Sequence, residues 1–255
     1  MDLTKRQNEI LNLLIEQNTV HSSDLSEKYS VSTETIRKDL NVLDALGYAK
    51  KHHGYATISP QYLKEYLNID SKKGLNNQEK IAIAQRALSF VPDNSVIYCD
   101  SGTTVCELVR LLVARSSVTI VTPSLAIVEI MKSLPDKNHH LFLLGGYVNY
   151  DSALTRQMEF DNSIEQFRFA AAFLGTTGVR YYDGPTSSKY NEGLLRQRAM
   201  ARSASNIVLC DHTKFLSGGV HQYATWKDCT YLITDSIPDQ SMRESLEKQI
   251  EVIYC

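Results

Sequence analysis

The sequence predicts an α/β protein in two parts: a small, mostly helical N-terminal unit and a larger three-layer α/β domain with a mostly parallel sheet. Up to about residue 57, three short stretches with helical spacing precede an alternating polar segment. After about residue 75, short apolar runs alternate with amphipathic helices. Apolar runs without alternation are typical of strands that are buried on both faces, as in parallel sheets covered by helices.

The composition is that of an ordinary globular protein. The chain has 255 residues, with 27 lysines and arginines, 29 aspartates and glutamates, and 43% hydrophobic residues. This length accommodates one large domain or two unequal ones, each with its own core, and excludes disorder for most of the chain. The net charge of -2 excludes a protein that coats nucleic acid through a strongly basic surface, although a small basic site can be hidden in the average.

The chain shows no signal for a membrane, a disulfide framework or a metal site. No stretch approaches the roughly 18 consecutive apolar residues of a membrane span, and the first ten residues lack the apolar core of a signal peptide. The five cysteines form no C-x-x-C motif, and the paired histidines at 52–53 and 139–140 lack a convincing ligand set. We therefore expect a cytoplasmic protein with reduced thiols, no metal and no cofactor.

Two short helices are predicted at the start of the chain. The first follows Thr4, a good amino-terminal cap, and carries Ile10 and Leu14 at helical spacing. The second covers 22–29, where serines and an acidic residue favour a helix start.

A third helix is predicted from Ser32 to about Gly47, a residue type common just past a helix end. Its apolar positions 36, 40 and 43 lie on one face. The alternating residues that follow, 48–57, predict a small hairpin.

The larger domain is expected over 75–255, separated from the domain over 1–57 by a linker over 58–74 that shows little periodicity. Asn76 and Glu79 resemble a capping box. The helix after them carries an apolar stripe at residues 81, 84, 88 and 91. Seven apolar runs predict strands at 96–99, 118–121, 141–144, 170–174, 207–210, 231–233 and 252–254. Ligands of such sheets bind beyond the carboxyl ends of the strands.

The third predicted helix has a polar and cationic face formed by Thr33, Arg37 and Asn41. A recognition helix enters the DNA major groove with its first turns, where hydroxyls meet phosphates or base edges and arginine binds guanine. The pattern favours a winged helix-turn-helix that binds double-stranded DNA through Ser32, Thr33, Thr35, Arg37, Lys38, Lys50, Lys51 and His53. The alternative is a solvated helical face with an ion pair between Glu34 and Lys38.

The run from Val31 to Gly47 resembles the helix-turn-helix signature of the DeoR family of bacterial transcriptional regulators. The family's wing usually carries His-Gly-Gly-Ala, whereas this chain has His53, Gly54, Tyr55 and Ala56. The resemblance implies a winged helix-turn-helix whose wing tip is altered by one bulky residue.

A second candidate site follows the strand over 96–99. The loop Asp100, Ser101, Gly102, Thr103 and Thr104 joins this strand to a helix. Small residues at a helix start present free backbone amides and hydroxyls to an anion, and the helix dipole assists. The loop is no nucleotide-binding motif, because neither a P-loop nor a dinucleotide fingerprint is present. A plain strand-to-helix turn is the alternative interpretation.

Other polar segments follow predicted strands at Gly145-Gly146, at 175–178 and at 211–215, and the helix expected over 191–204 adds two charged residues. If they converge at one sheet edge, Lys214 and Arg196 would bind phosphate and Asp100 or Asp211 would bind sugar hydroxyls. The predicted effector site comprises Asp100, Ser101, Gly102, Thr103, Thr104, Gly146, Thr177, Gly178, Glu192, Arg196, Asp211 and Lys214. A surface ion pair between Glu192 and Arg196 is the alternative.

The larger domain also resembles the DeoR family's sensor domain, so the resemblance covers nearly the whole chain. The matching segments are 100–104, 144–146, 173–175 with Gly178, 192–200, Asp211 with 214–215, and 233–235. The resemblance implies a fold similar to ribose phosphate isomerase and glucosamine phosphate deaminase, and a phosphorylated sugar or related metabolite as effector. The chain departs from the family at 175–178, 211–214 and 122–124, segments that would line the pocket.

An enzyme of the isomerase or deaminase type is the alternative function. Proton abstraction next to a carbonyl needs a positioned carboxylate. In the isomerase relatives an acid lies in the loop that corresponds to 175–178, where this chain has Thr176 and Thr177. A hydroxyl is a very weak base, so catalysis is not expected.

The sequence therefore predicts a DNA-binding regulator with an N-terminal winged helix-turn-helix and a C-terminal α/β effector domain. The resemblance implies a repressor of carbohydrate genes that a phosphorylated sugar releases from DNA, while activation stays open. One recognition helix reads few base pairs, so we expect a homodimer or homotetramer.

Overall fold

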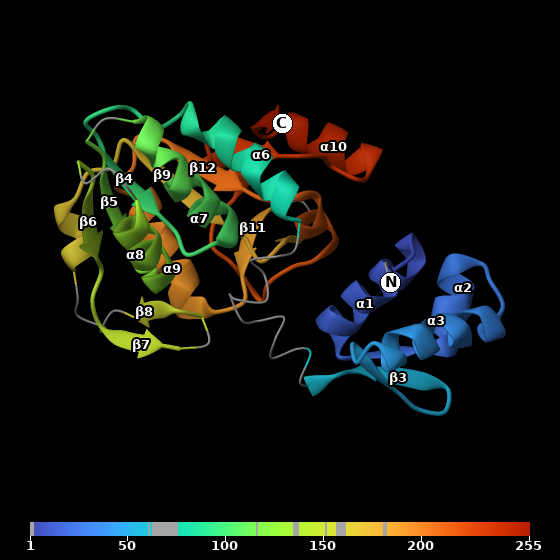
Figure 1. Cartoon of the computed structure of the whole chain (residues 1–255). Coiled ribbons are helices and arrows are strands. Elements are labelled where there is room, and N and C mark those ends of the chain that lie inside the picture. The colour runs from blue at the N-terminus through green and yellow to red at the C-terminus, as the bar shows by residue number, and fades with distance from the viewer. Residues whose placement is uncertain are drawn as a thin grey trace. The chain divides into compact units, whose positions relative to one another are not determined.

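The structure is a computed structural model that describes residues 3–60, 62, 76–115, 117–134, 138–150, 152–156, 162–180 and 183–255. The chain divides into two compact units, Met1–Ser71 and Lys72–Cys255, called here the N-terminal and C-terminal units (Figure 1). Most of the linker predicted over 58–74 lies outside the described residues. No helix in the described part of the chain is long and apolar enough to cross a membrane.

In its described residues, the N-terminal unit contains three helices, given below, and a three-stranded sheet of order β1-β3-β2. Its elements are α1 (Lys5–Gln17), β1 (Thr19–His21), α2 (Ser22–Tyr29), α3 (Thr33–Ala45), β2 (Ala49–Lys51) and β3 (Tyr55–Ile58). The three predicted helices and the hairpin are confirmed. Thr4 and Gln7 form a capping box at α1, and Ser32 caps α3 by accepting from the Thr35 amide. Strand β1 was not predicted, because three residues are too few to show a pattern.

A buried carboxylate joins α1 to α3. Asp39, on α3, is 5% exposed. It accepts hydrogen bonds from Arg6 Nε at 2.6 Å and Gln7 Nε2 at 3.0 Å. These bonds, together with apolar side chains of all three helices, fix the orientation of α3 within the unit.

The C-terminal unit is built on a seven-stranded parallel sheet of order β15-β14-β12-β9-β4-β5-β6. All seven strands predicted from apolar runs are confirmed. They are β4 (Val96–Cys99), β5 (Thr119–Thr122), β6 (His140–Leu143), β9 (Ala171–Gly175), β12 (Asn206–Leu209), β14 (Tyr231–Thr234) and β15 (Glu251–Tyr254).

Helices cover both faces of this sheet, so the unit has three layers (Figure 1). One face packs against α6 (Asn77–Leu88), α7 (Thr103–Arg110) and α8 (Leu125–Ser133). The other packs against α9 (Tyr190–Met200) and α10 (Gln240–Glu247). Trp226 is 1% exposed and lies in the cluster beside α10. The predicted three-layer α/β architecture is confirmed.

Shorter elements lie between the main ones and were not predicted. A two-stranded hairpin consists of β7 (Tyr147–Asn149) and β8 (Leu154–Arg156). A three-stranded antiparallel sheet contains β10 (Val179–Arg180), β11 (Gly184–Ser187) and β13 (His221–Gln222). Four 3-10 turns complete the described residues: η1 (Leu111–Ala114), η2 (Ser163–Gln166), η3 (His212–Leu216) and η4 (Trp226–Asp228).

The start of α6 differs from the prediction. Asn76 makes no side-chain cap and has a left-handed backbone with φ 49°. Its Nδ2 instead donates to Asp211 Oδ1 at 3.2 Å, so the predicted capping box with Glu79 is wrong. The buried face is also shifted, because Ile83, Ala84 and Ala87 are fully buried, whereas residues 81 and 88 are only partly so. A tertiary partner takes the side chain that local spacing had assigned to the cap.

The direction of chain progression reverses at β4. Strands β5 and β6 lie on one side of β4, and β9, β12, β14 and β15 lie on the other. The carboxyl ends of β4 and β9 therefore form the topological switch point, where open α/β sheets bind their ligands. Asp100 directly follows β4, and Gly175 is the last residue of β9.

Candidate functional site

The exposed face of α3 and the β2–β3 turn line one groove of about 760 Å³ in the N-terminal unit. The predicted residues Thr33, Arg37, Lys51 and His53 all line it. Arg37 Nη1 lies 3.2 Å from Glu34 Oε2, and both side chains are more than half exposed. Such a pair is weak, so the guanidinium is available to DNA at little cost.

The other predicted DNA-binding residues lie around this groove. Ser32 caps α3, and its Oγ lies 2.9 Å from Thr35 Oγ1, so both hydroxyls contribute to the helix start. Lys38 and Lys50 are exposed. The prediction omitted Ser22, Ser23 and His52, which also line the groove. The start of α2 was considered only as a helix signal, although its serines precede the turn that brings α2 beside α3.

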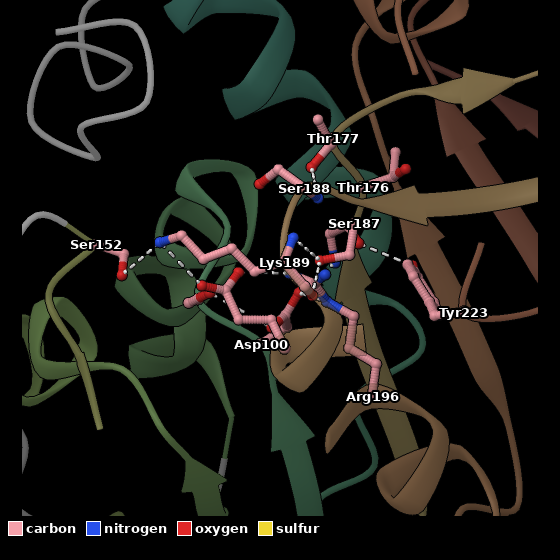
Figure 2. A network of polar contacts seen from close by, with 12 residues as sticks. Asp100, Ser152, Thr176, Thr177, Ser187, Ser188, Lys189, Arg196 and Tyr223 are labelled. Atoms are coloured by element: carbon pink, nitrogen blue, oxygen red, sulfur yellow. Dashed lines mark hydrogen bonds and ion pairs between the residues drawn. The ribbon is translucent and has the colours of Figure 1, made fainter. Parts of the chain in front are cut away.

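In the C-terminal unit, a buried ion pair lies at the switch point (Figure 2). Asp100 is 3% exposed and Arg196, on α9, is 6% exposed. Asp100 Oδ2 accepts from the Gly175 amide at 2.9 Å and from Arg196 Nε at 2.8 Å. Burial by itself lowers the pKa of Arg196, but Asp100, Tyr223 and Glu192 together outweigh burial and raise it, so the guanidinium is charged.

This pair changes the roles expected of both residues. The alternative of an ion pair between Glu192 and Arg196 is confirmed as a contact of 3.9 Å, but the pair does not lie on the surface, because Arg196 is buried. Asp100 is the closer partner of Arg196, at 2.8 Å. Asp100 binds β9 and α9 at the same time. These two residues therefore set the geometry of the switch point. Arg196 also keeps one buried donor, Nη1, that has no partner in the described part of the chain.

The loop that follows β4 presents unpaired helix amides, as an anion site requires. Gly102 is the N-cap of α7, with an extended backbone and no side-chain cap. Ser101 and Thr104 are buried and Thr103 is half-buried. A Cβ on Gly102 would lie 3.5 Å from the Cα of Gly175, so the loop packs closely on the end of β9. The first-turn amides and threonine hydroxyls can bind a phosphate group.

Two predicted effector residues in the loop after β9, Thr177 and Gly178, hold neighbouring segments of the chain in place. Thr177 Oγ1 accepts from the Ser188 amide at 3.0 Å and so holds the segment that leads into α9. A Cβ on Gly178 would come within 1.9 Å of the Ser217 carbonyl oxygen, so close packing requires this glycine. Gly146 is exposed beyond β6 and has a φ of 122°, a backbone conformation that favours glycine.

Asp211 and Lys214 lie in a neighbouring polar cluster after β12. Asp211 is 1% exposed and caps the 3-10 turn that carries Lys214. Lys80, on α6, is 4% exposed, and burial lowers its pKa although Asp211 opposes this shift. His212 Nδ1 lies 2.6 Å from Asp235 Oδ2, and this hydrogen bond raises the pKa of the histidine.

Two residues at the switch point were not predicted (Figure 2). Lys189, the N-cap residue of α9, has its Nζ 3.2 Å from Ser152 Oγ and 3.3 Å from Glu192 Oε1. The Tyr223 hydroxyl donates to the Gly175 carbonyl at 2.8 Å, and the Arg196 guanidinium lies 5.2 Å from the centre of its ring. Lys189 and Glu192 are three residues apart at a helix start, and this spacing could have revealed the ion pair between them.

Comparison with known proteins identifies both units. Residues 6–61 match the model of a DeoR-like helix-turn-helix domain, and residues 75–236 match the model of a DeoR C-terminal sensor domain.

Relatives match along nearly the whole chain. HTH-type transcriptional regulator GolR of Listeria innocua is 31% identical, over 91% of this chain and 90% of its own. A glycerol-3-phosphate regulon repressor of Haemophilus influenzae is 24% identical, over 100% of this chain and 98% of its own. A ribose 5-phosphate isomerase structure from Methanocaldococcus jannaschii matches with a TM-score of 0.39 and 16% identity, covering 55% of each chain.

Proposed function

The chain belongs to the DeoR family of bacterial transcriptional regulators, and from this premise we propose that it represses a carbohydrate operon and is released from DNA by a phosphorylated sugar. One observation carries the proposal: the same chain contains two candidate binding elements. The N-terminal unit exposes a recognition helix, α3, and the C-terminal unit presents the uncapped start of α7 at its switch point. The relative that represses a glycerol-3-phosphate regulon supports a phosphorylated effector.

Operator binding is assigned to α3 and the β2–β3 wing. The first turns of α3 would enter the major groove, with Thr33 and Arg37 at the bases or phosphates and Lys51 and His53 at the backbone. Because one recognition helix reads few base pairs, two copies of the chain would bind two half-sites as a homodimer or as part of a homotetramer. A cytoplasmic location follows from this role.

Effector binding is assigned to the loop Asp100–Thr104, which would hold the phosphate, with Glu192 available to sugar hydroxyls. The proposed coupling is thermodynamic: the effector binds more tightly to a state of the protein that fits the operator poorly, and so weakens DNA binding. A thermal-shift screen of the full chain against phosphorylated sugars and their neutral counterparts would identify the effector class.

Replacing Arg37 with alanine is expected to weaken operator binding by about 1–3 kcal/mol, because one contact to a guanine or a phosphate is lost. The measurement is a gel-shift titration on DNA that the wild-type protein selects from a random pool. Arg243→Ala is the matched control, since Arg243 is also exposed and also pairs with a carboxylate on its own helix. Unchanged binding by Arg37→Ala would remove this residue from the interface.

We also propose that the C-terminal unit is not an enzyme. The loop from Gly175 to Gly178 contains no carboxylate, and Asp100, which lies against it, is occupied by Arg196. Glu192, the other carboxylate of the proposed effector site, is paired with Lys189 and Arg196, so we assign no general base to the sugar. Incubation with a panel of sugar phosphates is expected to give no turnover by NMR, and clear turnover would overturn the regulatory proposal for this unit.

A further inference from the structure

A phosphate held at the start of α7 needs a positive charge nearby, and the predicted cations are poorly placed to provide it. Arg196 is bound to Asp100 through Nε, and although its Nη1 has no partner in the described residues, its side chain is only 7% exposed. Lys214 follows β12, which is two strands away from β4 in the sheet. Adjacent strands are about 4.8 Å apart, so these strand ends are separated by roughly 10 Å.

Lys189 is better placed. Its Nζ contacts Ser152, the residue before Ala153. Ala153 and Thr103 line the same groove of about 320 Å³, which extends along α7 and α8. The lysine side chain reaches from the start of α9 toward Ser152 (Figure 2). The ammonium group thus contacts the residue next to Ala153, on the edge of a groove that extends to Thr103, the first residue of α7.

The present contacts of Lys189 can be exchanged at low cost. The side chain is 30% exposed, Ser152 offers a neutral hydroxyl, and Glu192 is shared with Arg196. The 3.3 Å between Lys189 Nζ and Glu192 Oε1 is longer than a typical charge-assisted hydrogen bond, so this contact is weak. When Lys189 turns toward a ligand, Arg196 still neutralises Glu192.

We propose that Lys189 is the cation that binds the effector's phosphate at the loop Asp100–Thr104, and that Ser152 and Glu192 hold it while the site is empty. The proposal rests on the proposed function and deepens it, because it names the residue that selects a phosphorylated ligand over its neutral counterpart. Arg196 is then a positioning residue, and Lys189 is the residue that contacts the ligand.

The test measures binding of inorganic phosphate to the full chain by the rise in unfolding temperature, with chloride at equal ionic strength as reference. The wild-type protein is expected to be stabilised by phosphate. Lys189→Gln is expected to weaken phosphate binding about 10- to 100-fold, because a charge-assisted contact is lost. Lys189→Arg is expected to keep most of the affinity. Lys227→Gln, which removes one charge from an exposed lysine of the same unit, is the control.

The unfolding temperature of each variant in chloride reports whether its C-terminal unit is folded. If the wild type responds and Lys189→Gln responds equally, the role of Lys189 is wrong while the phosphate site of the proposed function stands. If the wild type shows no shift beyond that in chloride, the phosphate site itself fails, and the role of Lys189 with it. If Lys227→Gln weakens binding as much as Lys189→Gln, general charge explains the effect and the proposal is overturned.

Discussion

Replacing Arg196 with leucine is expected to lower the free energy of unfolding of the C-terminal unit by about 3–5 kcal/mol, because the Asp100 carboxylate stays buried without its partner. Asp100 retains the Gly175 amide as a donor, but one amide does not compensate a full charge. The measurement is urea unfolding followed by circular dichroism.

Two further variants separate the ion pair from the loss of packing. The double variant Asp100→Asn with Arg196→Leu is expected to recover much of the loss, since the amide side chain still accepts from Gly175 and carries no charge. Arg243→Leu breaks an exposed pair on α10 and should cost less than about 1 kcal/mol. A cost for Arg196→Leu as small as that of the control would contradict the assigned role of the pair.

Replacing both Thr103 and Thr104 with valine is expected to raise the effector concentration needed to release operator DNA by roughly 100-fold or more, because two hydroxyl contacts to a charged group are lost. Valine has nearly the shape of threonine, so the buried Thr104 can be replaced without a large change in volume. DNA binding without effector should be unchanged.

The measurement is operator release titrated with whichever sugar phosphate stabilises the wild-type chain. Thr119→Val is the control, since Thr119 begins β5, at the opposite end of the strand from the switch point. A double variant that responds as the wild type does would remove the loop from the effector site.

The strands and helices could be predicted because their patterns are local. The inner strands of the parallel sheet are buried on both faces and therefore appear as continuous apolar runs, whereas the edge strands β6 and β15 are only partly buried. The helices of the N-terminal unit carry their own start signals, such as Thr4 and Ser32.

The contacts at the site could not be predicted in the same way. Asp100 and Arg196 are 96 positions apart, and only the sheet order brings the end of β4 beside α9. The same reason explains the failed capping box, because the partner of Asn76 is Asp211, 135 positions away. Local spacing identifies the polar residues that can form a site, but the topology of the sheet decides which partner each of them contacts.

Trp226 gives the two units different optical properties. It is the single tryptophan of the chain and lies buried in the C-terminal unit. In the N-terminal unit, only tyrosine side chains absorb near 280 nm. With excitation at the red edge of the indole band, emission therefore reports on the C-terminal unit alone. The intrinsic fluorescence of the unmodified protein can thus follow one unit while the other is bound to DNA, without an attached dye.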